Sequence, residues 1–422
     1  MAAYDGMHGE DAHPVAELRE TNRYAIQQAD RRAEVQHAKQ REDQRETVQQ
    51  IRRCLKSKKE YDTHEILHVV DLLVARMLWH QLRGFAAHWL MVEDGAVPTG
   101  NFGRYMSRNR CTDIFPDLHF VDNEAPRTRD ELWKLRPVVD SLQQRFLAGW
   151  SLPAVFSFDE GVLPSTSHRN TTRMFMPDKP HRYGSKMSMC DSRTAYCHRS
   201  EIYACQHRHD ARGGASSYDH KTGAAAVVRN LKVVLASNRH QWHVIVVDRF
   251  YSSVLLCVEL LAMNVYVGTA MANRLGLDPA PKAGRSTSIP RGTFMLAMSV
   301  AIPSMVMFHW WDRKPVPYVC TATFMTESTI GRKVKQLGAI TIRLQKYSLQ
   351  TSTKFLKYYR SLFLGFVDLA LVNAFLSHKE AAVMDGKPAM KRGTWFGVLQ
   401  NQLLQLTAED FAGVVATPLS GS

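Results

Sequence analysis

Two aspartates, Asp159 and Asp248, each stand at the end of a short apolar run: LPAVFSFDEGV at 152–162 and WHVIVVDRFYSS at 242–253. A continuous apolar run of this length is typical of a strand buried on both faces. In α/β folds the chemistry lies where such strands end and the chain leaves the sheet. Two carboxylates held side by side there repel each other unless a divalent cation lies between them. The pattern by itself leaves two interpretations, a divalent-metal site and a cap of the following helix, which strand-terminal Asp residues often form.

The elements around these two strands follow a mixed order. Strands are expected at 186–190 and 195–205, and helices at 222–237 and 252–263. Strand, hairpin strands, helix, strand and helix is the order of a ribonuclease-H-like α/β core. The stretch 268–325 is punctuated by Gly and Pro and carries short apolar runs without a helical period, which predicts a β-rich insertion. Helical regions are expected before and after this core.

A chain of 422 residues exceeds the usual size of one hydrophobic core, so several domains are expected. The predicted regions are a charged, helical or partly disordered arm at 1–60, a helical N-terminal domain at 61–150, the first part of the core at 151–267, the β-rich insertion at 268–325, the remainder of the core and a helix at 326–380, and a C-terminal helix and tail without a zinc module at 381–422.

The composition favours a polyanionic partner. Net charge is +14, from 54 basic and 40 acidic residues, which fits DNA, although many basic proteins bind no nucleic acid. Seven cysteines, an odd count, do not suggest a secreted disulfide framework. We see no signal peptide, and the apolar stretch 254–267 is too short to span a bilayer. We expect a soluble intracellular protein without a membrane partner.

Several long segments resemble the piggyBac-type transposases. They include FDEG at 158–161, MPDKPHRYGSKMSMCDSRTAY at 176–196, VVDRFYSSVLLCVELLAMNVYVGTAMANR at 246–274 and HWWDRKPVPYVCT at 309–321. The similarity runs from about residue 60 to about residue 413. The resemblance implies metal-dependent DNA cleavage and strand transfer, in which two cations activate the attacking oxygen and stabilise the leaving one.

The resemblance also assigns roles to residues. Asp159 and Asp248 match the first two of the family's three catalytic, metal-binding aspartates, and the implied cofactor is Mg²⁺ or Mn²⁺. It implies DNA as the partner, a nuclear location, no small-molecule substrate, and leaves a homodimer open. The basic residues that support nuclear import, or simply form a solvated helix face, are Arg52, Arg53, Lys56, Lys58 and Lys59.

The third aspartate of the family pattern is missing. Family members carry a GVDxxDQ-type motif where residues 336–340 here run directly into 341–345, through either a real deletion or a gene-model error. The substitutes to weigh are Asp312, Glu327 and Asp368. Because misplacing reactive groups by about 1 Å can lower the rate a hundredfold, we expect impaired catalysis. The alternatives are a non-catalytic DNA- or partner-binding relative and a decayed genomic copy without a selected role.

Side chains that could contact the DNA backbone follow the two aspartates. The candidates are Arg169, Arg173, Lys179, Arg182, Lys186 and Arg249. Such contacts would be salt-dependent and independent of base sequence; the alternative is a solvated basic surface. Trp310 and Trp311 could stack on a splayed base, but burial in the insertion is favoured.

A cysteine and histidine cluster raises the question of zinc. Its members are Cys190, Cys197, His198, Cys205, His207 and His209. Structural zinc sites usually place paired ligands two to four residues apart, whereas seven positions separate Cys190 from Cys197. We therefore favour a structural role for this cluster. Family members also have a C-terminal cysteine-rich module, and no cysteine follows Cys320 here, so specific recognition of transposon ends is not expected.

Overall fold

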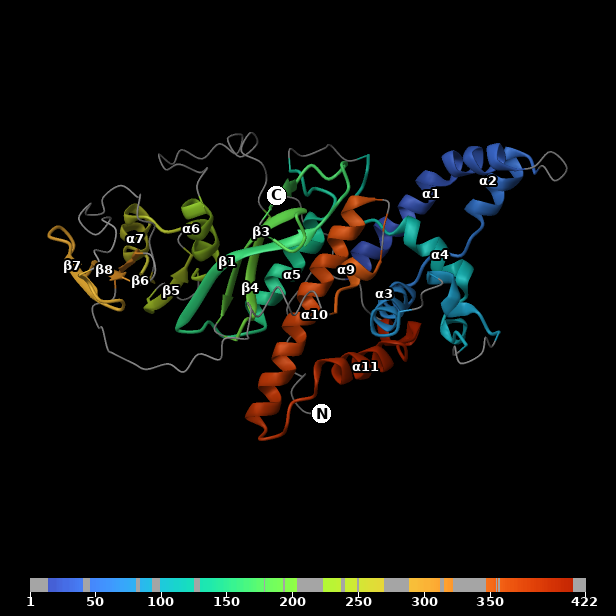
Figure 1. Cartoon of the computed structure of the whole chain (residues 1–422). Helices are drawn as coiled ribbons and strands as arrows, with labels where there is room; N and C mark the ends of the chain where they lie inside the picture. Colours follow the sequence, from blue (N-terminus) through green and yellow to red (C-terminus); the bar gives the residue numbers. More distant parts are fainter. Residues whose placement is uncertain are drawn as a thin grey trace. The chain divides into compact units, whose positions relative to one another are not determined.

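The computed structural model divides into two compact units (Figure 1). Unit 1 comprises Met1–Leu142, Tyr347–Asp368 and Ala382–Ser422, and unit 2 comprises Gln143–Lys346 and Leu369–Ala381. The structure describes residues 14–40, 46–80, 84–92, 99–124, 130–177, 179–192, 194–202, 223–236, 240–248, 250–268, 288–311, 315–321, 347–353, 355 and 357–412.

Unit 1 is helical. Its elements are α1 (Pro14–Lys39), α2 (Val48–Lys56), α3 (Thr63–Leu78), the 3₁₀ turns η2 (Phe85–Trp89) and η3 (Phe102–Arg104), α4 (Arg108–Asp117), α9 (Leu349–Ser352), α11 (Arg392–Leu403) and the 3₁₀ turn η6 (Ala408–Phe411). Two further helices, α5 (Arg136–Ala148) and α10 (Tyr358–Met384), supply residues to both units. The core of unit 1 joins residues far apart in the sequence, such as Leu72, Ile114 and Leu404.

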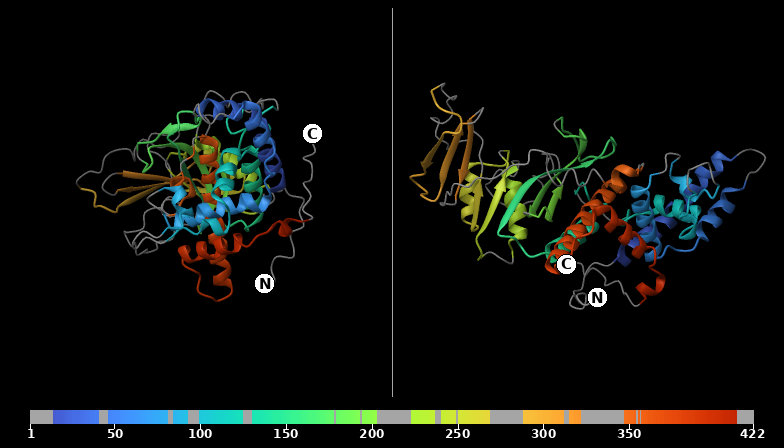
Figure 2. Two further views of the ribbon diagram at one scale, coloured as in Figure 1. Left: turned by 90° about the vertical axis from the view of Figure 1, so that its right-hand side faces the viewer. Right: turned by 60° about the horizontal axis from the view of Figure 1, so that its bottom comes forward.

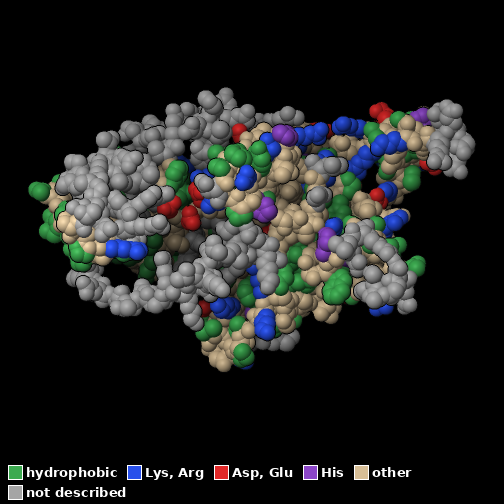
Figure 3. Space-filling view, in the orientation of Figure 1, with side chains coloured by type: hydrophobic (Ala, Val, Ile, Leu, Met, Phe, Trp, Pro, Cys, Tyr) green, Lys and Arg blue, Asp and Glu red, His purple; other side chains and the backbone are tan. Residues whose placement is uncertain are grey.

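The charged N-terminal region forms ordered helices. α1 buries Tyr24, Ala29 and Ala33 even though its composition is polar. Lys and Arg side chains gather over α1 and α2 (Figure 3). Several of them have acidic partners: Arg52 lies 2.9 Å and Lys56 3.2 Å from Asp30 Oδ1. The described residues of this region thus lie mostly in α1 and α2.

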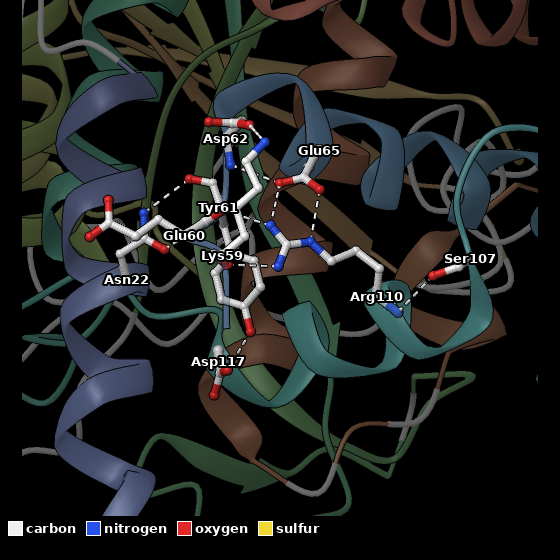
Figure 4. Close-up of polar contacts among 9 residues, drawn as sticks. All are labelled: Asn22, Lys59, Glu60, Tyr61, Asp62, Glu65, Ser107, Arg110 and Asp117. Carbon is white, nitrogen blue, oxygen red and sulfur yellow. Dashed lines mark hydrogen bonds and ion pairs between the residues drawn. The ribbon is translucent and has the colours of Figure 1, made fainter. Parts of the chain in front are cut away.

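Arg110 of α4 fastens the segment that precedes α3 (Figure 4). Its guanidinium donates to both carboxylate oxygens of Glu65 at 2.8 and 2.6 Å and to the carbonyls of Lys59 and Glu60 at 2.8 and 2.6 Å. The same group lies 4.5 Å from the ring centroid of Tyr61. Glu65 also accepts from the backbone N–H of Asp62, the N-cap of α3. The planar guanidinium thus donates hydrogen bonds to the first turn of α3 and to the loop before it at the same time.

Unit 2 is built on a mixed sheet. Its first strands are β1 (Val155–Pro164), β2 (Arg173–Phe175), β3 (Tyr183–Ser192), β4 (Cys197–Ile202), β5 (His243–Val247) and β6 (Val265–Gly268), with helices α6 (Gly223–Val234) and α7 (Val254–Leu261). β1 pairs antiparallel with β3, and β3 antiparallel with β4, whereas β1–β5 and β5–β6 are parallel. Strand, hairpin strands, helix, strand, helix is the predicted order, so the ribonuclease-H-like α/β fold class is confirmed.

The β-rich insertion is also present. β7 (Phe294–Met298), β8 (Val306–Trp311) and β9 (Pro315–Cys320) form a three-stranded antiparallel ribbon. Gly268 of β6 pairs with Cys320 of β9, and the Thr321 N–H that follows donates to the Val267 carbonyl at 3.2 Å, so these contacts join the ribbon to β6. Figure 2 shows the ribbon at the end of the sheet, next to β6. These strands coincide closely with the three apolar runs of the sequence.

The second half of α10 packs within unit 2. Asn373 accepts a hydrogen bond from the Cys197 N–H at 2.9 Å and donates one to the Cys197 carbonyl at 2.9 Å. This pair of bonds satisfies the backbone N–H and carbonyl of Cys197 at the start of β4. Among the described helices α10 is long and apolar enough to cross a membrane by composition, but 61% of its most apolar window is buried inside the protein. A core helix has the same character, and we infer no membrane span.

Candidate metal-binding carboxylate site

Asp159 and Asp248 lie side by side on unit 2's sheet. The parallel register pairs Phe158 with Val247, so the next residue on each chain segment is one of the two aspartates. Both are exposed, and the negative charge of Asp248 acts on the Asp159 carboxyl. The space-filling view shows acidic side chains grouped with basic ones in this part of unit 2 (Figure 3). The structure thus brings together the two residues that the sequence singled out.

Strand periodicity decides which way the two aspartates face. Phe156 and Phe158 of β1 are each 1% exposed and pack with Ile245 and Val247 of β5 beneath α6 and α7. Because neighbouring residues of a strand point to opposite faces, Asp159 points away from this core. A slip of one residue would expose both phenylalanines and bury the aspartate. At about 1.5–3 kcal/mol for each buried Phe side chain, the core fixes the register.

Neither aspartate caps a helix. Asp159 is inside β1, and α7, which follows Asp248, has Ser253 as its N-cap, whose hydroxyl accepts from the Leu256 N–H at 3.1 Å. The Asp248 carbonyl instead accepts from the Tyr251 N–H and the Ser252 hydroxyl, each at 3.0 Å. These bonds form a tight turn directly after β5. The helix-capping interpretation is therefore excluded for this pair.

The surroundings of Asp159 raise the pKa of its carboxyl above the ordinary value of an aspartate. Partial removal of water by the surrounding protein raises the pKa of Asp159, and the charges of Glu160 and Asp248 raise it further. The Glu160 N–H, which donates to Asp159 Oδ1 at 2.7 Å, and the charge of Lys179 act in the opposite direction. A bound divalent cation would relieve this repulsion, so the oxygen donors of the pair fit Mg²⁺ or Mn²⁺.

The carboxylate of Glu160 forms ion pairs with two lysine side chains. Lys186 Nζ lies 2.6 Å from its Oε2 and Lys179 Nζ 3.3 Å from its Oε1. The Tyr251 hydroxyl donates to Oε2 at 3.4 Å. Burial alone would raise the pKa of Glu160, but the hydrogen bond and charge of Lys186, aided by Lys179, lower it overall. We call Glu160, Lys179, Lys186 and Tyr251 the Glu160 cluster.

The sequence reasoning missed this cluster. It named Lys179 and Lys186 only as candidate DNA contacts and assigned no role to Glu160. One signal was available: in a strand, Glu160 must point to the face opposite Asp159. The partners of Glu160 come from separate loops and strands, so no local pattern identifies them.

The other basic candidates differ in their contacts. Arg173 of β2 donates to the Thr166 carbonyl at 2.9 Å and lies 4.8 Å from the ring centroid of Tyr183, so the protein itself holds its guanidinium. Arg169 and Arg182 are exposed. Arg249 lies outside the described residues.

Of the three candidates for a third acid, the structure describes Asp368. Asp368 is 3% exposed and accepts from the Ser348 hydroxyl at 2.8 Å and from the N–H groups of Leu349 and Gln350 at 2.7 and 3.1 Å. Burial raises its pKa to about 6 although these bonds act against the rise. Its carboxylate caps the start of α9 in unit 1, which is a structural role. Asp312, Glu327 and the 336–345 junction lie outside the described residues.

The cysteine and histidine cluster is only partly described. Cys197 and His198 are adjacent in β4 and buried, and the Cys197 thiol donates to the Arg199 carbonyl at 3.4 Å. Burial lowers the pKa of His198 to about 4. Cys205, His207 and His209 lie outside the described residues, as does the side chain of Cys190. Within the described ranges no group of three or more His, Cys, Asp or Glu side chains is arranged to hold a metal ion.

The tryptophans of the insertion are largely inside it. Trp311 is 9% exposed, with its ring 4.4 Å from that of His309, and Trp310 is partly buried. Burial was the favoured prediction for both residues.

Comparisons with known proteins agree with this architecture. A family model described as Transposase IS4 matches residues 18–362. Two human proteins, PiggyBac transposable element-derived protein 3 and a chimeric ERCC6-PGBD3 protein, are each 26% identical over 193 residues, which is 45% of this chain but only 31% and 17% of those proteins. The match thus spans less than a third of either relative. A solved piggyBac transposase synaptic complex with hairpin DNA is similar in fold, with a TM-score of 0.64 at 17% identity, over 100% of this chain and 88% of that one.

The family model extends over most of the chain, from α1 of unit 1 through the sheet that carries both aspartates to the first turns of α10. The long segments quoted from the sequence lie within it. This protein therefore belongs to the IS4 transposase family and is of the piggyBac type.

Proposed function

We propose that this protein binds DNA and holds a divalent cation between Asp159 and Asp248, as a transposase of reduced catalytic power. One observation carries the proposal: the two aspartates directly follow Phe158 and Val247, which pair with each other across parallel strands and are both buried in the core, and both aspartates are exposed. Transposases of this kind typically use divalent metals, and oxygen ligands suit Mg²⁺ or Mn²⁺.

The residues of the site would have different roles in binding the metal. Asp159 and Asp248 supply the carboxylates, and the turn from Asp248 to Ser252 fixes the second of them. Divalent metal held by these carboxylates would supply activation of the attacking oxygen and stabilisation of the leaving oxygen of a phosphodiester. Glu160 is engaged with two lysines and is not counted among the ligands.

Reduced activity follows from the missing third acid. Asp368, the described candidate, is committed to capping α9, with three hydrogen bonds to its carboxylate. Two carboxylates alone hold a cation less firmly and position the reacting oxygens less well, and small misplacements lower rates steeply. The same observation favours a second candidate function, a DNA-binding relative without catalysis.

DNA is the partner for which the support is broadest. The chain carries a net charge of +14, and the similar solved structure is a synaptic complex with hairpin DNA. Because Lys179, Lys186 and Arg173 are engaged within the protein, we assign backbone contact first to the exposed Arg169 and Arg182. A nuclear location forms part of this proposal.

A cleavage assay separates the two candidate functions. Full-length protein, Asp248→Ala and Asp159→Asn would be incubated with plasmid and oligonucleotide DNA in Mg²⁺ or Mn²⁺. The proposal expects slow, metal-dependent nicking that either substitution abolishes. Equal residual cleavage in all three proteins would leave only the non-catalytic function.

A binding assay tests the DNA contact. The affinity for duplex DNA should fall as salt rises, and Arg169→Ala with Arg182→Ala should make the logarithmic slope shallower by about 0.9 for each phosphate that an arginine no longer neutralises. Asp248→Ala should leave that slope unchanged. Affinity independent of salt would contradict phosphate binding by these arginines.

A further inference from the structure

Glu160 follows Asp159 directly but serves the opposite face of the sheet. Phe156, Phe158 and Glu160 alternate along β1 on the side covered by α6 and α7. Tyr251, whose hydroxyl reaches Glu160, packs its ring edge-on against Phe158 with centroids 5.1 Å apart. The exposed Asp159 lies on the other face. The side chains of Glu160 and Asp159 therefore point to opposite faces of β1.

The partners of Glu160 come from three segments around the site. Lys186 belongs to β3, where its backbone faces Val162, two residues beyond Glu160, which places it at a diagonal cross-strand position within reach of a long side chain. Lys179 comes from the connection between β2 and β3, and Tyr251 from the turn after β5. The Lys186 ammonium also lies 4.5 Å from the ring centroid of Phe250 in the same turn.

These contacts converge on the turn that carries Asp248. The Tyr251 N–H donates to the Asp248 carbonyl at 3.0 Å, while its side chain bonds Glu160 and packs on Phe158. Moving Tyr251 would therefore move Asp248 relative to Asp159. Hydrogen bonds to charged groups are stronger than neutral ones, so a carboxylate with two ammonium partners is a firm anchor.

We propose that Glu160 is a positioning residue, which ties β3 and the Asp248 turn to β1 through Lys186 and Tyr251 and so keeps the two metal-binding aspartates adjacent. This inference rests on the proposed function only for the role of the aspartates. It removes Glu160 from the candidate ligands and gives Lys186, whose side chain is 15% exposed, an internal role instead of a DNA contact.

Mn²⁺ binding by the full-length protein, followed through the electron paramagnetic resonance signal of free Mn²⁺, tests the assignment. Residues that orient metal ligands typically change affinity by 10- to 100-fold. Glu160→Gln and Lys186→Met should each weaken Mn²⁺ binding about 10-fold, and the double variant should weaken it little further because both act through one contact. Lys232→Met, an exposed lysine near Glu259 in the same unit, is the matched control and should change nothing.

The two roles of Glu160 give opposite results for Lys186→Met. If Glu160 were a ligand, removing its lysine would free the carboxylate and leave Mn²⁺ affinity equal or tighter. That outcome, with unchanged thermal unfolding, would overturn the proposal.

Amide hydrogen exchange of the metal-free protein supplies an independent measurement. Glu160→Gln and Lys186→Met should both speed exchange in residues 243–253, and Lys232→Met should not. If Asp248→Ala binds Mn²⁺ as tightly as the wild type, the aspartate pair does not hold the ion and the proposed function fails. The exchange measurement alone then decides whether Glu160 has the positioning role. Unchanged exchange in both variants would refute it.

Discussion

Replacing Asp71 with Asn should stabilise the protein at neutral pH. Asp71 lies in α3 at 0% exposure, and neither carboxylate oxygen has a hydrogen-bond partner in the described part of the chain. Burial without a compensating partner raises the pKa of Asp71 from 3.8 to about 8, because the charged form loses its hydration. The folded protein therefore keeps this carboxyl protonated at neutral pH, whereas the unfolded chain ionises it.

The sign and size of the effect follow from linkage. Below pH 3.8 both states are protonated and Asp71 has no pH-dependent effect; between pH 3.8 and about 8 the unfolded state is favoured increasingly as pH rises. Each pH unit in that window lowers the free energy of unfolding by about 1.4 kcal/mol. At pH 7 the loss reaches about 4 kcal/mol, a large fraction of a typical domain's stability. Asn cannot ionise, so the Asp71→Asn variant does not suffer this pH-dependent loss of stability.

Urea unfolding at pH 5 and pH 7.5 measures this difference. The stability of Asp71→Asn relative to wild type should increase by about 3 kcal/mol between the two pH values. Hydrogen exchange of α3 assigns the change to unit 1, which matters because a chain of two units need not unfold in one step. Asp30→Asn, at an exposed carboxylate on α1 of the same unit, is the control and should show no such increase. Parallel pH profiles for wild type and Asp71→Asn would refute the reasoning.

Two further substitutions test structural roles. Asp368→Ala should lower the free energy of unfolding by about 2–4 kcal/mol, because buried N–H groups at the start of α9 lose their acceptor. Urea denaturation measures this loss. If the variant instead loses Mn²⁺ affinity at unchanged stability, Asp368 is a metal ligand. Arg110→Lys should lower stability by about 2–3 kcal/mol in thermal unfolding, because an ammonium cannot replace the planar fork. The exposed Arg108→Lys is its control, and a fully stable Arg110→Lys would contradict the account.

Much of the fold could be predicted from local patterns. The apolar runs before Asp159 and Asp248 are strands β1 and β5, and the apolar runs in 268–325 are the strands of the insertion. The helices expected at 222–237 and 252–263 are α6 and α7, with ends moved by a few residues. Such patterns succeed because burial of one face imposes a period on the sequence.

Long-range partners could not be predicted in this way. α1 is polar by composition, yet it is ordered because Tyr24 and Ala33 are buried in unit 1. Asp71 occupies a helical position that its neighbours would suggest is apolar, and only the fold shows that its carboxylate has no hydrogen-bond partner among the described residues. Each of these depends on residues brought together by folding rather than by neighbourhood in the chain.

The sequence by itself determined the family, the places of the strands and the identity of the two aspartates, because an apolar run that leads into a carboxylate is a local signal. It placed the end of the first strand wrongly, since β1 continues past Asp159 to Pro164. Tertiary structure alone decided that the two are adjacent on one face, that Glu160 belongs to the other face with Lys186 and Lys179, and that Asp368 caps a helix. The physical reason is that strand pairing and charge partnership join segments distant in the sequence, and a carboxylate's role depends on which groups those segments place around it.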